Sequence, residues 1–360
     1  MTDPTIDIVQ SQSALERICD AIDGAARCFF DTEFLREKTY YPQLCLMQVR
    51  CADNIWLIDP LADIRLDEFY AALFETQLVM HSGRQDLEVL RISAGKLPNK
   101  IFDTQIAAGL VGLSPQIGYA KLVEQYCDVS LDKAHTRTNW SRRPLAADVL
   151  QYAEDDVRYL PRVHDALFET LDQLNRLEWA EQDAAAMLSP ALYDNPTALA
   201  WQRVRGFGNL PTALQQRVML LADWRERVAQ QSDRPRQWIL RDEPLINLAA
   251  LPTVDADTIA ACEGVHPKFA QRHHQAIIET LDLPVPDAPA FAARPDDDER
   301  ARSKRMAASV RAVAGDVGVE AEVLAPRREL NAAARGDRKL RALSGWRNAI
   351  VGDQIRAEMP

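Results

Sequence analysis

Two acidic residues inside an otherwise apolar run constrain this chain more than any other feature of its sequence. Asp31 and Glu33 lie in the run CFFDTEF at residues 28–34, which predicts a largely buried β-strand. Their side chains, two positions apart, would project from the same face of that strand. Two carboxylates on one face repel each other unless a cation lies between them. As ordinary acids of an edge strand they would need no further explanation, but the surrounding phenylalanines favour metal ligation.

Three further residues extend this set. Asp86 lies just inside a predicted helix that follows a predicted strand, where the helix dipole alone would also favour an acid. Tyr152 and Asp156 are four positions apart and share one helix face; for this pair alone, a half-buried tyrosine beside a surface acid is the better explanation. Glu154 and Asp155 would point to other faces. The order of the whole set favours a phosphodiesterase site with two metal ions.

The bulk composition describes a globular protein of two or three domains. The chain has 360 residues, 47% of them hydrophobic, which is too long for one ordinary domain. No apolar run approaches the roughly 20 residues that a membrane helix requires, and the N-terminus lacks the features of a signal peptide. The six cysteines form no Cys-x-x-Cys pair. We therefore expect reduced thiols, no structural zinc and a cytoplasmic location.

Charge is distributed unevenly along the chain. The net charge of −11 argues against a nucleic-acid partner. However, residues 1–200 carry 18 Lys and Arg against 31 Asp and Glu, whereas residues 201–247 carry 8 against 5 and residues 301–350 carry 11 against 5. An acidic body with basic C-terminal segments fits a metal-dependent catalytic domain joined to modules that bind a polyanion. Solvated, Arg-rich helix faces explain the charge alone about equally well.

The periodicity of apolar residues predicts strands first and then strands alternating with helices, which indicates an α/β sheet flanked by helices. The predicted strands are residues 28–34, 43–51, 54–59, 78–81 and 100–104, the first three forming an antiparallel meander. The predicted helices are residues 66–74, 84–93, 105–111 and 144–174, with Pro161 ending or bending the last one.

Two linkers divide the rest of the chain. Residues 189–197 precede a second, helical unit at 201–283. Residues 283–298 are rich in proline and aspartate and form the clearest linker. Beyond it, residues 301–355 have an all-helical, basic pattern.

The ordered set of acids and tyrosine resembles the DEDD exonuclease superfamily and, more closely, its ribonuclease D family. The segments similar to the three exonuclease motifs are residues 31–34 with 40–48, residues 81–87, and residues 152–157. The segments similar to the family's intervening regions are residues 102–108 and 131–133 with 137–140. The histidine subclass of the superfamily has a histidine five residues before its last aspartate. That position is Gln151 here, so the chain resembles the tyrosine subclass.

The resemblance implies an α/β ribonuclease H-like exonuclease domain, with a mixed sheet flanked by helices, followed by two all-α HRDC-like domains. Residues 224–226 and 233–240 resemble the HRDC domain, whereas the second such domain is inferred mainly from its position. The expected boundaries are residues 1–190 for the exonuclease domain, 201–283 for the HRDC domain and 299–360 for the second HRDC-like domain.

The same resemblance implies a mechanism with two divalent cations, Mg²⁺ or Mn²⁺, on four catalytic acids. Asp31 would bridge both ions, Glu33 and Asp156 would complete one site, and Asp86 would hold the second ion, largely through waters. Tyr152 would orient an attacking water toward the terminal phosphodiester. An oxygen-only ligand set suits these ions better than zinc. The products would be nucleoside 5′-monophosphates.

Four further residues are candidate substrate contacts. Phe34 would stack on the terminal base, although an ordinary core position would explain this phenylalanine equally well. His81 fits a buried strand residue better than a substrate contact. Lys133 and Arg137 would hold phosphates, although loop charges are more often simply solvated.

The function implied is a 3′–5′ exoribonuclease that acts on RNA with a free 3′ end, with tRNA precursors as the expected substrates. A DNA-directed exonuclease and a non-catalytic nucleic-acid-binding adaptor are the alternatives, since no residue here identifies a contact with the ribose 2′-hydroxyl. We expect no membrane partner and, by default, a monomer.

Overall fold

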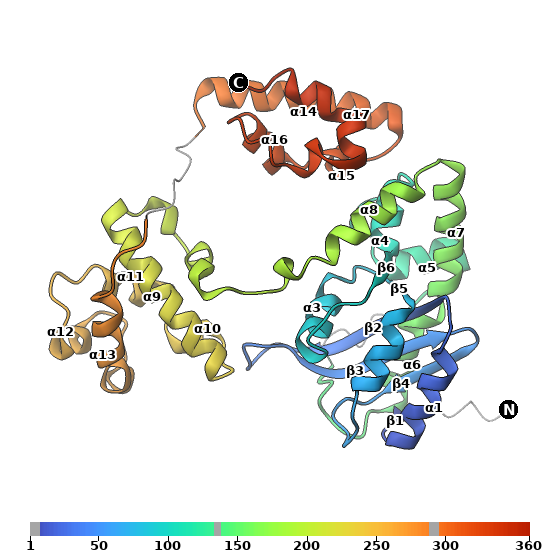
Figure 1. The fold of residues 1–360 in the computed structure, drawn as a ribbon, viewed down its shortest axis with the longest axis horizontal. Helices are drawn as coiled ribbons and strands as arrows, with labels where there is room; N and C mark the ends of the chain where they lie inside the picture. Colours follow the sequence, from blue (N-terminus) through green and yellow to red (C-terminus); the bar gives the residue numbers. More distant parts are fainter. Residues whose placement is uncertain (1–7, 133–137, 288–294) are drawn as a thin grey trace. The chain divides into compact units, whose positions relative to one another are not determined.

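The computed structural model describes residues 8–132, 138–287 and 295–360 (Figure 1). Most contacts fall within two units of the chain. The first unit contains residues 8–35, 44–193 and 295–360. The second unit contains residues 36–43 and 194–287. The C-terminal residues therefore cluster with the acid-bearing part of the chain, although a long stretch of sequence separates them from it.

Six strands of the first unit form one mixed sheet in the order β1-β4-β3-β2-β5-β6. Strand β3 pairs antiparallel with β4, whereas β2 with β5, β5 with β6 and β1 with β4 pair in parallel. The strands are β1 (Ile8–Val9), β2 (Arg27–Leu35), β3 (Gln43–Cys51), β4 (Asn54–Ile58), β5 (Gln77–Met80) and β6 (Lys100–Asp103). The expected mixed sheet is confirmed, and β2, which carries Asp31 and Glu33, lies near its middle.

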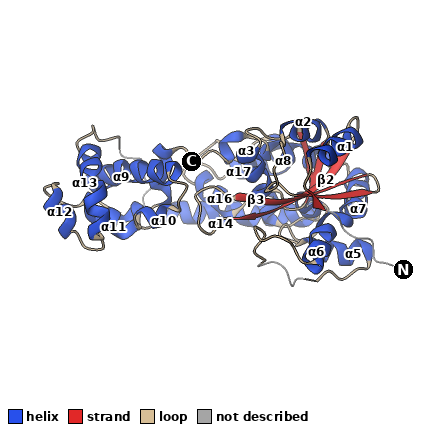
Figure 2. Ribbon diagram, turned by 90° about the horizontal axis from the view of Figure 1, so that it is seen from below, coloured by secondary structure: helices blue, strands red, loops and turns tan. Residues whose placement is uncertain are grey.

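Helices cover both faces of this sheet, as Figure 2 shows with the strands in red. The helices in chain order are α1 (Gln12–Ile22), α2 (Asp67–Glu75), α3 (Arg84–Ser93), α4 (Thr104–Leu110), α5 (Tyr119–Cys127), α6 (Ala147–Arg158), α7 (Leu160–Gln173) and α8 (Leu177–Met187). Alternation along β2 assigns its faces: Phe30 packs in the core with α1, α2 and α3, whereas Phe29 packs in the core with α4, α5 and α7. The acids, in register with Phe29, therefore belong to the second face.

The predicted helices agree closely with these bounds, except that one predicted helix is divided into two. Residues 144–174 form two helices, because α6 ends at Arg158 and Pro161 lies in the first turn of α7, where proline loses no helical hydrogen bond. Helices α1, α5 and α8 go beyond the predicted elements. A 3₁₀ helix at Pro190–Leu192 follows α8. Within the described residues, no helix combines the length and hydrophobicity needed to cross a bilayer.

The C-terminal part of the first unit is helical and packs on α8. Its elements are α14 (Asp297–Val317), α15 (Ala321–Leu324), α16 (Arg327–Ala333), a 3₁₀ helix (Arg341–Leu343) and α17 (Gly345–Arg356). The Trp346 ring of α17 stacks on Trp179 of α8, with ring centroids 4.2 Å apart. The next residue, Arg347, is buried and forms a two-pronged ion pair with Asp183. Apolar and ionic contacts thus join α17 to α8.

The second unit is a bundle of helices around its own apolar core. Its elements are the 3₁₀ helices Thr197–Arg203 and Phe207–Asn209, then α9 (Thr212–Gln231), α10 (Arg236–Ile239), α11 (Asp242–Ala249), α12 (Ala256–Ala261) and α13 (Pro267–Leu281). A fully buried guanidinium, that of Arg225 in α9, donates to the Leu240 carbonyl and to Asp242. Residues 36–43 join this unit through the Tyr40 hydroxyl, which donates to the Glu226 carboxylate at 2.5 Å.

Candidate active site

Three of the predicted metal ligands meet on the α6-facing side of the sheet. Asp31 and Glu33 project from β2, and Asp156 projects from α6, so that one carboxylate oxygen from each lies within 4.8 Å of the others. All three side chains are partly buried. Strand alternation brings the first two together, whereas only the packing of α6 on β2 adds the third.

Burial and mutual repulsion disfavour the charged form of this cluster. Burial is the main cause that raises the pKa of Glu33 to about 9 and that of Asp156 to about 8. The pKa of Asp31 is raised well above its ordinary value, by burial first and then by the charges of Asp86, Asp156 and Glu33. A bound cation would offset both effects, because it attracts the ionised carboxylates and separates their charges.

Asp86 lies beside this cluster but outside the group of three. It belongs to the first turn of α3 and is 6% exposed. The Thr32 hydroxyl of β2 donates a hydrogen bond to its carboxylate. Burial raises the pKa of Asp86 to about 6, and the Thr32 hydrogen bond opposes that shift. Thr32 had no assigned role in the sequence, since only the fold places its hydroxyl next to an acid 54 positions away.

The turn from β5 to α3 is shaped by Asp103 and Gly83. The Asp103 carboxylate accepts hydrogen bonds from the Gly83 backbone amide at 2.8 Å and from the Ser82 amide at 3.3 Å, and it also caps the N-terminus of α4. A Cβ atom on Gly83 would lie 1.9 Å from the Met80 sulfur. A larger residue at the position that begins the helix of Asp86 would therefore force the buried Met80 side chain to shift.

Helix α6 presents Tyr152 and Asp156 one turn apart, as their spacing predicts. Burial raises the pKa of Tyr152, and the charges of Asp156, Glu33 and Asp31 raise it further. The phenol therefore lies within the field of the acid cluster and stays protonated at neutral pH. The neighbouring acids of α6, Glu154 and Asp155, pair instead with Arg158.

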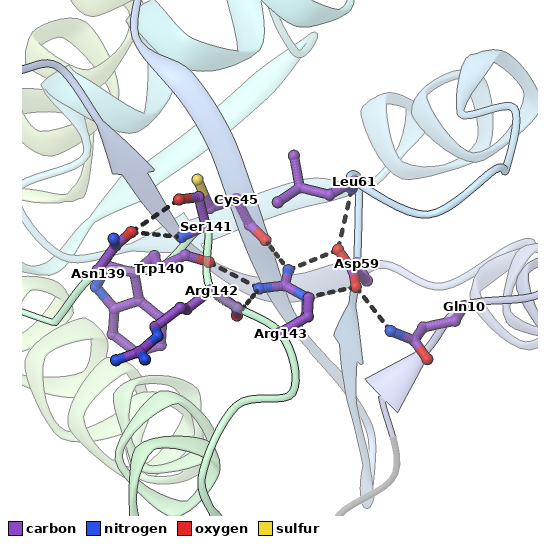
Figure 3. A network of polar contacts seen from close by, with 9 residues as sticks. All are labelled: Gln10, Cys45, Asp59, Leu61, Asn139, Trp140, Ser141, Arg142 and Arg143. Carbon is purple, nitrogen blue, oxygen red and sulfur yellow. Dashed lines mark hydrogen bonds and ion pairs between the residues drawn. The ribbon is translucent and has the colours of Figure 1, made fainter. Parts of the chain in front are cut away.

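An ion pair with the buried Asp59 carboxylate fixes the segment that leads into α6 (Figure 3). The Arg143 guanidinium donates two hydrogen bonds of 2.6 Å to the Asp59 carboxylate, and it also donates to the backbone carbonyls of Cys45 and Trp140. Asp59 is almost fully buried after β4 and accepts a further hydrogen bond from Gln10. Residues 139–143 are thereby held to β3 and to the end of β4.

The predicted substrate contacts are placed differently from one another. Phe34 is partly buried and packs with the core of α1, α2 and α3, on the face opposite the acid cluster. The His81 ring contacts Thr104 at 3.0 Å and lies beside Tyr119; burial lowers its pKa. Lys133 and Arg137 lie outside the described residues. A substrate role for each of the four stays a prediction.

Tyr119 of α5 is a second residue that the sequence did not single out. Its hydroxyl donates to the backbone carbonyl of Asp155 at 3.1 Å. Burial and the charges of Asp156 and Asp31 raise its pKa, which places the phenol near the acid cluster. A cavity of about 220 Å³ opens beside α6, lined by Leu131, Asp132, Asp148, Gln151, Tyr152, Asp155 and Asp156.

The chemistry of the cluster fits a hard divalent cation. Its ligands are carboxylate oxygens alone, close enough together for one ion to contact all three. Burial and the charges of neighbouring carboxylates raise the pKa values of all three acids. The six cysteines are free thiols.

Models of two known families match this chain. Residues 6–172 match the family described as a 3′-5′ exonuclease, and residues 215–281 match the HRDC domain. The first match spans the sheet and the acid cluster, and the second spans most of the helical bundle of the second unit. The fold and site thus define a 3′–5′ exonuclease that carries an HRDC domain.

Relatives match the chain over nearly its full length. Ribonuclease D of Xanthomonas oryzae pv. oryzae is 38% identical over 92% of each chain, and that of Acidiphilium cryptum is 34% identical over 96% of this chain and 91% of its own. The crystal structure of Escherichia coli RNase D superposes with a TM-score of 0.89 at 27% identity and covers 98% of both chains. The chain therefore belongs to the ribonuclease D family and is a 3′–5′ exoribonuclease, as the sequence predicts.

Proposed function

We propose that this chain hydrolyses the terminal phosphodiester of structured RNA with two divalent cations, and that it matures the 3′ ends of tRNA precursors. The observation that carries the proposal is the convergence of Asp31, Glu33 and Asp156 within 4.8 Å, with Asp86 and Tyr152 beside them. The remaining expectations, a cytoplasmic monomer that releases nucleoside 5′-monophosphates, belong to the same proposal.

Four acids would hold the cations, which we take to be Mg²⁺ or Mn²⁺. Asp31, Glu33 and Asp156 would ligate directly, and Asp86 would act mainly through waters because it lies outside the close group. Divalent cations at such a site lower the pKa of an attacking water and stabilise charge on the leaving oxygen.

Tyr152 would position the attacking water. Its raised pKa keeps the phenol protonated at neutral pH, so that it donates a hydrogen bond rather than acting as a base. Tyr152 lies one turn before Asp156 on α6, and the charges of the clustered acids act on its phenol, which supports this role. The adjacent cavity lined by Tyr152 and Asp156 is where we place the 3′-terminal nucleotide.

Helical parts of the chain would hold the rest of the RNA. The E. coli relative is described as an exoribonuclease involved in structured RNA processing, which supports structured RNA as the substrate. In the second unit, which contains the HRDC match, Trp238 is 61% exposed. The exposed Arg234 and Arg241 flank it in sequence. An exposed tryptophan between arginines suits base stacking and phosphate contacts.

We also propose the domain boundaries 1–190, 201–283 and 299–360. The all-helical content of the last segment supports a second HRDC-like domain, although its helices cluster with the first unit. Its basic composition would add phosphate contacts that weaken as the salt concentration rises.

Incubation of 3′-labelled RNA and DNA with Mg²⁺ tests the proposed reaction. The wild type is expected to release mononucleotides from RNA and none in EDTA. Asp31→Ala should lower the rate by about 1,000-fold or more because it removes one of the three carboxylates that would hold the cations. Tyr152→Phe should lower it by about 100-fold. Glu154→Gln, which changes an acid of α6 that pairs with Arg158, should retain wild-type activity.

Two results would contradict the proposal. Absence of mononucleotide release from either substrate by the wild type would favour a non-catalytic nucleic-acid-binding adaptor. Degradation of DNA with RNA spared would reassign the substrate to DNA.

A further inference from the structure

A fully buried amide in β3 has no hydrogen-bond partner. Gln48 is 0% exposed, and neither its Nε2 nor its Oε1 has a partner among the described residues. An unpaired amide in a protein interior loses its hydrogen bonds to water without replacement, so native structures seldom retain one without a reason.

The strand pairing shows which way this amide points. Gln48 pairs directly with Leu57 of β4, and side chains paired across antiparallel strands share one face. Leu57 packs in a cluster with Val149 and Ala153 of α6. Gln48 therefore faces α6.

Its neighbours along β3 confirm this direction. Leu46, two positions before, packs in the same cluster with α6, and Arg50, two positions after, donates to the Arg158 carbonyl at the end of α6. Gln48 lies between these two contacts. The stretch of α6 above it is bounded by Ala153 and Arg158 and contains Asp156.

The adjacent strand carries the other acids on the same face. Strand β2 is the neighbour of β3 on the side away from β4, and Asp31 and Glu33 of β2 meet Asp156 of α6. Gln48 is thus an unpaired donor and acceptor beneath the helix, and beside the strand, that together form the acid cluster.

We propose that Gln48 is a positioning residue of the metal centre, whose Nε2 group donates to the carboxylates of Asp31 or Asp156 and holds them in the orientation that binds a cation. A ligating carboxylate keeps oxygen lone pairs that do not contact the metal, and a donor fixed behind it sets its orientation. The amide is a suitable donor because it carries no charge of its own and so adds no electrostatic barrier to cation entry. This inference rests on the proposed function.

The test compares metal binding with metal-free stability in the full chain without RNA. Gln48→Met keeps the length and volume of the side chain and removes both polar atoms. We expect its Mn²⁺ dissociation constant, measured by titration calorimetry, to rise by about tenfold or more, while its unfolding temperature in EDTA is unchanged or higher. Gln48→Leu should behave alike. Met47→Leu, a buried neighbour on the opposite face of β3, is the control and should keep wild-type affinity.

The outcomes separate this inference from the proposed function. A rise of threefold or more in the dissociation constant of Gln48→Met, with Met47→Leu within twofold of the wild type, supports the inference. A smaller rise overturns it, as does the failure of both Gln48 variants to fold, since either result assigns the amide a structural role. If the wild type neither binds Mn²⁺ nor hydrolyses RNA, the proposed function itself fails.

Discussion

At the scale of single residues, the acid cluster lowers the stability of the metal-free fold and provides ligands for a cation. Asp31, Glu33 and Asp156 are partly buried, and burial first, then the charges of nearby carboxylates, raise their pKa values. A carboxyl whose pKa is higher in the folded chain than in the unfolded chain destabilises the fold once it must ionise. The same carboxyl, when ionised beside a cation, is a ligand.

Asp156→Asn should separate these two effects. Burial raises the pKa of Asp156 to about 8, so a neutral amide of the same shape should stabilise the metal-free chain at pH 8. Each kcal/mol gained would raise the unfolding temperature by about 2–4 °C in a domain of this size. The variant should gain no stability from Mg²⁺ and should lose hydrolysis. Thermal scans in EDTA and in Mg²⁺ measure both effects, and an unchanged gain from Mg²⁺ would remove Asp156 from the ligand set.

His164 should make the fold sensitive to acid. The side chain is buried on α7 between Phe29 and Phe102, and burial lowers its pKa, with the Asp165 hydrogen bond acting against that shift. The stability that the neutral ring contributes is complete above the unfolded-state pKa of about 6.5 and is lost as the pH falls through the lower folded-state pKa.

His164→Gln should therefore reduce the loss of stability between pH 7 and pH 5. The slope that one such group contributes is at most about 1.4 kcal/mol per pH unit. Urea unfolding of variant and wild type at each pH measures the difference in slope. Parallel pH profiles would show that His164 does not titrate in this range.

At the scale of elements, α6 is fixed at three points along its length. Arg143 ties the segment before it to Asp59 (Figure 3), Tyr119 contacts its Asp155 carbonyl, and Arg50 contacts its last carbonyl. Tyr152 and Asp156 lie on α6 between these contacts. A helix held in this way presents its side chains to β2 in a fixed position, which ligation by both elements requires.

Arg143→Met should destabilise the chain by about 3–5 kcal/mol, because it leaves the buried Asp59 carboxylate without its cationic partner. Denaturant unfolding measures the loss. Replacement of both partners, Asp59→Leu with Arg143→Met, should restore part of the stability. The exposed neighbour Arg142 offers a matched control, since Arg142→Met should change stability by less than about 0.5 kcal/mol. If Arg143→Met and Arg142→Met lower the free energy of unfolding equally, the Arg143–Asp59 ion pair has no special role in stability.

At the scale of the whole molecule, residues 295–360 complete the apolar core of the first unit. Residues 295–360 share a core with the helices on one face of the sheet. The stacked pair Trp179 and Trp346 and the buried ion pair Arg347–Asp183 join helices far apart in sequence. The C-terminal segment therefore contributes to the stability of the unit that contains the acid cluster.

A chain that ends at residue 287 should expose the apolar surface of α4 and α8 that this segment covers. We expect a lower unfolding temperature and a tendency to aggregate, as an uncovered hydrophobic patch predicts. Trp346→Ala in the full chain should destabilise in the same direction, by about 3–5 kcal/mol at most. Calorimetry and light scattering measure both effects. An unaltered unfolding temperature for the shortened chain would show that the segment folds independently of the sheet.

Local patterns determined the elements that carry the chemistry. The alternation of β2, the position of Asp86 at the start of α3 and the four-residue spacing of Tyr152 and Asp156 are properties of neighbouring residues, so the sequence predicts them correctly. The division between α6 and α7 follows from the fixed geometry of Pro161. The resemblance to the ribonuclease D family then explained these residues as one site, and the relatives confirm the family.

The tertiary structure decided which distant residues act on one another. Nothing in the sequence near Thr32, Tyr119 or Gln48 indicates that Thr32 contacts Asp86 or that Tyr119 and Gln48 face α6, because these positions depend on how strands and helices pack. The same holds for residues 295–360, because their basic, helical pattern does not indicate that an apolar face of this segment packs on α8. By itself, the sequence determined the acids and their local geometry, because these depend on the periodicity of strand and helix. Only the fold decided their partners, because burial and packing join residues without regard to their distance along the chain.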